Sequence, residues 1–140
     1  MPTAYLTRRV TFAAAHRYRR PEWTDEKNSA VFGLCARPSY HGHTYNCDIT
    51  VRGEIDEMTG FVLDLGVLDE ILDREVKNRF DHRNINVEVP EFADGALVPT
   101  GENLARFIFE RVAASIPEPT RVTSVTVAED DSLSATYRED

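Results

Sequence analysis

Residues 32–47 read FGLCARPSYHGHTYNC, and the strand that begins inside this stretch determines the fold around it. From Tyr45 to Val51, apolar side chains alternate with polar ones. Alternation with period two is typical of a half-buried strand, in which residues two apart point to the same face. His41 and His43 fall in the same register as the apolar residues. The stretch therefore predicts a strand over residues 41–53 that begins with two histidines on its apolar face.

Two imidazoles on one face of a strand, separated only by Gly42, can bind a metal ion. Zinc is the natural candidate, because neutral imidazole suits it and catalytic zinc commonly takes three protein ligands plus a water or a substrate. The alternative is a polar strand start in which each histidine is bonded to a backbone carbonyl. The motif alone leaves both interpretations open.

Length and composition are those of a single domain spanning residues 1–140, with 41% apolar and 29% charged residues. Two cysteines argue against a disulfide scaffold and favour free thiols in a reducing compartment. No apolar run approaches the roughly 20 residues that a membrane span needs, and the N-terminus lacks a signal-peptide core. These features predict a cytoplasmic protein.

The formal net charge of −8 argues against nucleic acid and anionic membranes as partners. A group of cations nevertheless lies close to the central stretch. It is either a solvated face or a local site for a polyanionic substrate. Its members are Arg17, Arg19, Arg20, Lys27 and Arg37.

The rest of the chain predicts three further strands and two helices. Asp64 and Thr100 are good N-caps, and apolar residues recur after each at spacings of three and four, as in amphipathic helices. Residues 17–38 are expected to form a loop. The predicted order is strand 5–15, strand 41–53, helix 65–80, helix from 100 to before Pro117, strand 121–129 and strand 133–137. This ββααββ order predicts an α+β domain in which two helices cover one face of a four-stranded antiparallel sheet.

Three more positions are candidates for chemistry. His16 ends the first strand on its apolar face, as a possible third metal ligand or a hydrogen-bonded structural residue. Asp81 precedes His82 and could set the tautomer of its imidazole, although adjacent residues need not touch. Glu129 falls on the apolar side of its strand, where an unpaired carboxylate is costly. It therefore either reaches solvent at the end of the sheet or binds a specific partner.

Taken together, these segments resemble the 6-pyruvoyltetrahydropterin synthase family, which includes the 6-carboxytetrahydropterin synthases of the queuosine pathway. The resemblance runs nearly end to end. It rests on FAAAH ending at His16, FGLC around Cys35, HGHTY from His41, GEIDEMTGFV from Gly53, FDHRN from Phe80, PTGEN from Pro99 and VAE around Glu129.

The resemblance implies a tunnelling fold, in which trimers close their sheets into a β-barrel and two trimers form a homohexamer with active sites at subunit interfaces. It implies that His16, His41 and His43 bind zinc. Cys35 would be the catalytic base, with a pKa lowered by zinc or by protonated His82, and Asp81 would orient His82 for proton relay. Glu129 would anchor the pterin ring, and Thr100 and Glu102 match the pterin-pocket segment. Cys47 is expected to be a core residue.

The implied substrate is 7,8-dihydroneopterin triphosphate. A lyase of the pyruvoyl type would release triphosphate and form 6-pyruvoyltetrahydropterin. A carboxy-type enzyme would also release acetaldehyde. Five residues separate Cys35 from the HGH motif, as in animal pyruvoyl enzymes, where many queuosine-pathway members have three. Two positions depart from the family pattern: Gly101 stands where serine or threonine is usual, and Asp130 where threonine is usual.

Two other hypotheses for the function remain. One is a pterin- or purine-binding module without catalysis, which retention of Cys35, Asp81 and His82 argues against. The other is a fold relative such as an aldolase that acts on another dihydropterin, a kind of relative that typically lacks the zinc ligands.

Overall fold

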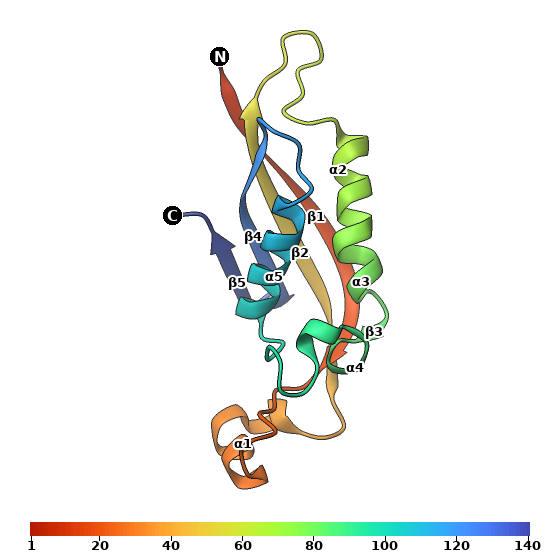
Figure 1. Ribbon diagram of the computed structural model, residues 1–140, viewed down its shortest axis with the longest axis vertical. Coiled ribbons are helices and arrows are strands. Elements are labelled where there is room, and N and C mark those ends of the chain that lie inside the picture. The colour runs from red at the N-terminus through yellow and green to blue at the C-terminus, as the bar shows by residue number, and fades with distance from the viewer.

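A computed structural model describes residues 1–140 as one sheet with helices on one of its faces (Figure 1). The two long strands β1 (Thr3–His16) and β2 (His41–Glu54) pair antiparallel along their whole length, from Thr3 opposite Glu54 to His16 opposite His41. This register brings the last residue of β1 beside the first residue of β2. Both strand predictions are confirmed.

The sheet has five strands in the order β3-β1-β2-β4-β5. β4 (Arg121–Asp130) pairs antiparallel with β2 and with β5 (Leu133–Arg138). β3 (Arg83–Asn84) runs parallel to β1. The α+β class is confirmed, but the prediction of a four-stranded, wholly antiparallel sheet is wrong. A strand of two residues is too short to show an alternating pattern. Its position is determined by tertiary contacts.

Those contacts come from the residues just before β3. The Asp81 carboxylate accepts a hydrogen bond from the backbone N–H of Ala13 at 2.9 Å, and the N–H of His82 donates to the Ala13 carbonyl. The two bonds hold the chain against the edge of β1, and β3 follows directly.

The two predicted helices are confirmed with their caps. The first comprises α2 (Leu65–Leu72), a π-helical turn (Asp73–Lys77) and α3 (Asn78–Phe80), and the second is α5 (Gly101–Ala113). The Asp64 carboxylate accepts from the N–H of Val67, and the Thr100 hydroxyl accepts from the N–H of Asn103. Figure 1 shows both helices on the same side of the sheet. No helix is both long and apolar enough to cross a membrane.

The predicted loop over residues 17–38 is wrong in its second half. That half contains α1 (Asp25–Phe32) and a 3-10 turn (Gly33–Ala36). α1 buries a single residue, Asn28, so it has no apolar stripe from which periodicity could be read. The Asn28 side chain instead bonds the backbone N–H and carbonyl of Arg20, which docks the helix through polar contacts. Two short helical segments, α4 (Ile85–Glu88) and a 3-10 turn (Pro90–Phe92), lie between β3 and α5, where the sequence predicts neither a helix nor a strand.

The core lies between the helices and one face of the sheet. Phe12, Tyr45, Ile49 and Leu104 are almost completely buried there, and each large apolar side chain contributes about 1.5–3 kcal/mol. The opposite sheet face is polar, with pairs such as Thr7 with Thr50. At the end of the core face, where α1 lies in Figure 1, histidines replace the apolar residues in the same register. The fold thus places a group of histidines at the end of the apolar core.

Candidate metal centre and active site

Three histidines meet where β1 ends and β2 begins. His16 lies opposite His41 in the register, and His43 follows two residues later on the same face. One nitrogen from each of the three rings lies within 4.8 Å of the others. The ring centroids are 4.6 to 5.2 Å apart. The prediction that these three side chains come together is confirmed.

The protonation of the cluster suits a cation. Nδ1 of His16 lies 2.8 Å from the carbonyl oxygen of Pro99, to which it donates, so Nε2 carries the lone pair. The Tyr45 hydroxyl lies 3.1 Å from Nδ1 and 3.3 Å from Nε2 of this ring. Burial lowers the pKa of His16 to about 4 and also lowers that of His41. Neutral imidazoles with free nitrogens are the ligands that zinc takes.

An unsatisfied atom points to the same conclusion. Nε2 of His43 is buried and has no hydrogen-bond partner. Buried polar atoms are nearly always satisfied, so an orphaned nitrogen beside two other imidazoles suits a ligand of a metal ion. The three histidines therefore fit a metal ion.

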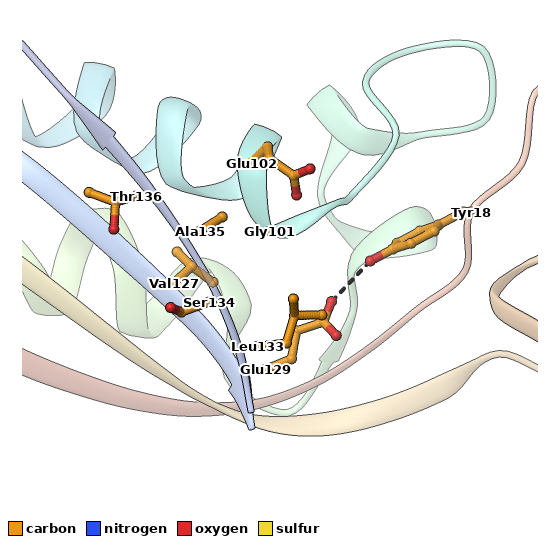
Figure 2. Close-up of a pocket in the computed structure, with 9 residues that line it drawn as sticks. All are labelled: Tyr18, Gly101, Glu102, Val127, Glu129, Leu133, Ser134, Ala135 and Thr136. Atoms are coloured by element: carbon orange, nitrogen blue, oxygen red, sulfur yellow. Dashed lines mark hydrogen bonds between the residues drawn. The ribbon is translucent and has the colours of Figure 1, made fainter. Parts of the chain in front are cut away.

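Glu129 stands beside the cluster near the end of β4. Its Oε2 lies 3.7 Å from Nε2 of His43, and its Oε1 lies 4.0 Å from Nε2 of His16. Oε1 also accepts a hydrogen bond of 2.9 Å from the Tyr18 hydroxyl (Figure 2). Of the two alternatives left by the sequence, the structure selects a carboxylate with a specific partner. Tyr18 was missed by the sequence reasoning, although it continues the even-numbered register of Phe12, Ala14 and His16.

Two cavities meet at Glu129. The first, of about 320 Å³, is bounded by Glu129, Tyr18 and Glu102, with the start of α5 and the facing part of β5 (Figure 2). The second, of about 570 Å³, contains Cys35, His41 and His43 as well as Glu129. The Glu129 carboxylate therefore lines both cavities. It shares the smaller one with Glu102, and it shares the larger one with the Cys35 thiol and two of the clustered histidines.

Cys35 lies in the 3-10 turn that follows α1. Its carbonyl accepts the backbone N–H of Tyr18 at 2.7 Å, which ties the turn to the end of β1. Burial, followed by the negative charge of Glu129, raises the pKa of the Cys35 thiol. The expected lowering of this pKa by protonated His82 has no counterpart within the chain, because His82 does not line the cavity of Cys35.

Asp81 and His82 do form the predicted pair. Nδ1 of His82 lies 3.0 Å from Oδ2 of Asp81. The hydrogen bond from Ala13 N–H is the largest cause that lowers the pKa of Asp81. The His82 side chain is 82% exposed, and its backbone has φ of 60°, which is rare for a residue with a Cβ. It lines another cavity of about 560 Å³ at the edge of the sheet, whose lining also includes His43.

Comparison with known proteins is consistent with this arrangement. A family model described as 6-pyruvoyl tetrahydropterin synthase matches residues 5–140. The chain belongs to the 6-pyruvoyl tetrahydropterin synthase family. A Drosophila melanogaster 6-pyruvoyl tetrahydrobiopterin synthase is 39% identical over 137 residues, covering 98% of this chain and 80% of the fly protein.

A solved structure and a relative of different name extend the comparison. The Caenorhabditis elegans 6-pyruvoyl tetrahydropterin synthase structure superposes with a TM-score of 0.92 at 32% identity, covering 100% of this chain and 98% of the worm chain. A Pyrococcus furiosus dihydroneopterin monophosphate aldolase is 31% identical over 126 residues, covering 90% of each protein. The chain is thus also similar to a protein that is named for a different reaction, an aldolase.

The two remaining candidates of the synthase motif PTGEN lie at the start of α5. Glu102 lines the smaller cavity, whereas the Thr100 hydroxyl caps α5 and is not among the lining residues. A Cβ at Gly101 would lie 3.4 Å from Cβ of Ala135, an ordinary contact. The departure from the synthase pattern at Gly101 therefore leaves the cavity slightly wider without being required by packing.

The five cations near the synthase motif FGLC differ in their contacts. Arg19 pairs with Asp25 at 3.0 Å, and Arg20 pairs with Glu22. Arg17 donates to the Ala36 carbonyl, and Lys27 lies over the Trp23 ring. Arg37 has no ion pair and lines the cavity of Cys35. Of the five cations, only Arg37 lies on the larger cavity without a partner in the chain.

Proposed function

We propose that this chain is a zinc-dependent 6-pyruvoyltetrahydropterin synthase, which converts 7,8-dihydroneopterin triphosphate to 6-pyruvoyltetrahydropterin and releases triphosphate. The observation that carries the proposal is the position of Glu129 on both cavities. A pterin has a flat, hydrogen-bonding ring and a reactive side chain. A carboxylate shared by two adjoining cavities can bind the ring in one while the side chain enters the other.

Recognition of the ring is assigned to Glu129. An ionised carboxylate only accepts hydrogen bonds, so it complements the adjacent N–H groups of a 2-amino-4-oxopyrimidine edge. Such charge-assisted bonds are stronger than neutral ones. Glu102 lies on the same cavity and offers a second acceptor to the ring.

His16, His41 and His43 would hold the zinc ion. When bound, zinc would act as a Lewis acid toward the side-chain oxygens and make adjacent protons more acidic. The chain's own contribution is the geometry of the three rings, and the bond from His16 to the Pro99 carbonyl orients the first of them.

Cys35 is assigned as the base that removes a side-chain proton. Its thiol lies on the cavity that contains His41 and His43, where the pterin side chain would enter. The Glu129 charge contributes to its raised pKa. Hydrogen bonding of Glu129 to the pterin offsets part of that charge, so ligand binding itself favours the thiolate.

Asp81 and His82 are assigned as the proton relay of a neighbouring copy. His82 is exposed, held by Asp81 and fixed in a strained backbone conformation, which is typical of a side chain presented to another surface. The strands β5 and β3 lie at open edges of the sheet. Pairing between such edges would close the sheets of several copies into a barrel and bring His82 to the Cys35 cavity of the next chain. The homohexamer implied by the resemblance provides such contacts.

The identity of the product distinguishes this function from the carboxy-type and aldolase reactions. Zinc-loaded protein is incubated with 7,8-dihydroneopterin triphosphate, and pterins, triphosphate and acetaldehyde are assayed together. We expect a pyruvoyl pterin and triphosphate without acetaldehyde. Acetaldehyde with a carboxypterin would assign the chain to the queuosine branch, and a 6-hydroxymethylpterin would assign aldolase chemistry. Bound zinc without turnover would favour a binding module.

A further inference from the structure

Tyr18 has a contact that none of the assigned roles explains. Its hydroxyl donates to Oε1 of Glu129 at 2.9 Å, as the dashed line in Figure 2 shows. Its backbone N–H donates to the Cys35 carbonyl at 2.7 Å. Its ring packs edge-on against those of His16 and Phe32, with centroids 5.1 and 5.8 Å apart. Main chain, ring and hydroxyl are therefore all fixed.

The carboxylate that Tyr18 contacts has a competing set of neighbours. Glu129 approaches Nε2 of His43 at 3.7 Å and Nε2 of His16 at 4.0 Å. A carboxylate this close to two imidazoles can turn toward them or toward a cation that they hold, because carboxylate oxygen is itself a common zinc ligand. In that orientation it would be less available to a ligand in the smaller cavity. The Tyr18 hydroxyl, which lines that cavity together with Glu102, opposes this rotation.

We propose that Tyr18 is a positioning residue, whose hydroxyl holds the Glu129 carboxylate toward the smaller cavity and so sets the specificity of ring recognition. The inference rests on the proposed function, in that the ligand is a pterin. A fixed acceptor carboxylate favours an edge with two adjacent donors, the ring N–H and the exocyclic amino group. A lumazine, in which a carbonyl oxygen replaces the amino group, presents only one donor on that edge. Tyr18 therefore contributes to discrimination between the two rings without contacting either.

The test compares binding of two ring types to the whole protein. Zinc-loaded wild-type, Y18F and Y5F proteins are titrated by fluorescence with neopterin and with its 2-oxo counterpart, a lumazine with the same side chain. Hydrogen bonds to charged groups are typically strong enough that Y18F should weaken neopterin binding about tenfold. The lumazine should bind with nearly unchanged affinity, so the affinity ratio of the two ligands should fall. Y5F makes the same change at a tyrosine that is 66% exposed and lies near the other end of β1.

Two further arms separate positioning from other roles. Zinc content, measured in every variant, should be unchanged in Y18F. In an E129Q background, the pterin preference should already be lost, and adding Y18F should leave the affinity ratio where it is. A further fall of the ratio in the double variant would mean that Tyr18 contacts the ligand itself.

Each outcome bears on the inference. An unchanged affinity ratio in Y18F would overturn it, as would equal weakening of both ligands, which indicates a general loss of packing. If wild-type protein binds neither ring, the proposed function fails, and the inference fails with it. If wild-type protein binds neopterin but Y18F binds it equally well, only the role of Tyr18 fails.

Discussion

Nδ1 of His16 lies 2.8 Å from the carbonyl oxygen of Pro99, so the loop before α5 determines which nitrogen of the buried histidine is free. His16 belongs to β1 and Pro99 to the loop that leads into α5, 83 residues further along the chain. A single contact therefore couples the histidine cluster to the segment that carries Glu102.

The first prediction concerns the metal. Replacing His43 by alanine removes one of three ligands, and changes in the surroundings of a ligand alone cost about 10–100-fold in affinity, so we expect zinc affinity to fall at least about 100-fold. Equilibrium dialysis followed by metal analysis measures this. H82A is the matched control, because His82 lies outside the cluster and its loss should leave zinc bound. Equal zinc loss in both variants would contradict the assignment of the ligands.

The second prediction separates the two cysteines. C35A should keep its zinc and lose turnover by about 100-fold to 10,000-fold, the usual contribution of a general base. C47A should retain turnover but unfold at lower urea concentration, because Cys47 is fully buried in the core and its removal leaves a small cavity. Steady-state kinetics and urea titrations of both variants provide the measurement. Near wild-type turnover of C35A would exclude the thiol as the base.

The third prediction tests whether the active site is shared between copies. C35A and H82A chains are unfolded, mixed in equal amounts and refolded. If Cys35 and His82 of different chains form each site, random assembly gives about a quarter of the sites both intact residues, and activity should recover to that extent. Each variant refolded alone is the control. No recovery in refolded mixed oligomers would contradict a shared site.

The fourth prediction concerns ring recognition. E129Q removes the charge that accepts from the pterin and should weaken neopterin binding about 100-fold, with zinc retained. E102Q changes the other glutamate of the same cavity and should have a smaller effect, because Glu102 is assigned a secondary contact. Fluorescence titration of the two variants ranks them. A larger loss in E102Q would exchange the two roles.

The fifth prediction is a pH dependence of stability at Asp81. Hydrogen bonding to Ala13 N–H lowers its pKa in the folded state below the ordinary value of 3.8. A group with a lowered folded pKa adds stability above its unfolded pKa and loses it as the pH falls through the folded value. Urea midpoints of wild-type protein and D81N should therefore differ more at pH 6 than near pH 3. A constant difference over this range would show that the carboxylate charge adds nothing.

The sequence predicted those features that depend on local pattern. Alternation identified β1, β2, β4 and β5, and the side chains of Asp64 and Thr100 identified the helix starts. The alternation placed His16, His41 and His43 on the apolar faces of their strands, and the resemblance to the family joined them as one ligand set. These are elements whose own residues specify them.

The features that were missed depend on tertiary contacts. β3 exists because Asp81 and His82 bond to Ala13, and α1 docks through Asn28 rather than through an apolar stripe. The sequence could not show that His82 lies outside the lining of the Cys35 cavity. The two motifs that carry these residues are typical of the family, but a motif does not say whether its residues meet within one chain or between two chains. Tyr18 was overlooked because its partner, Glu129, lies 111 residues away.

The central claim is that Glu129 joins ring recognition to the metal cluster. A crystal structure of the zinc-loaded protein with bound neopterin tests it most directly. We expect zinc on one nitrogen each of His16, His41 and His43. The pterin N–H edge should lie against the Glu129 carboxylate, and the side chain should point toward Cys35. A pterin ring away from Glu129, or a Glu129 carboxylate bound to the zinc with the ring elsewhere, would contradict the account.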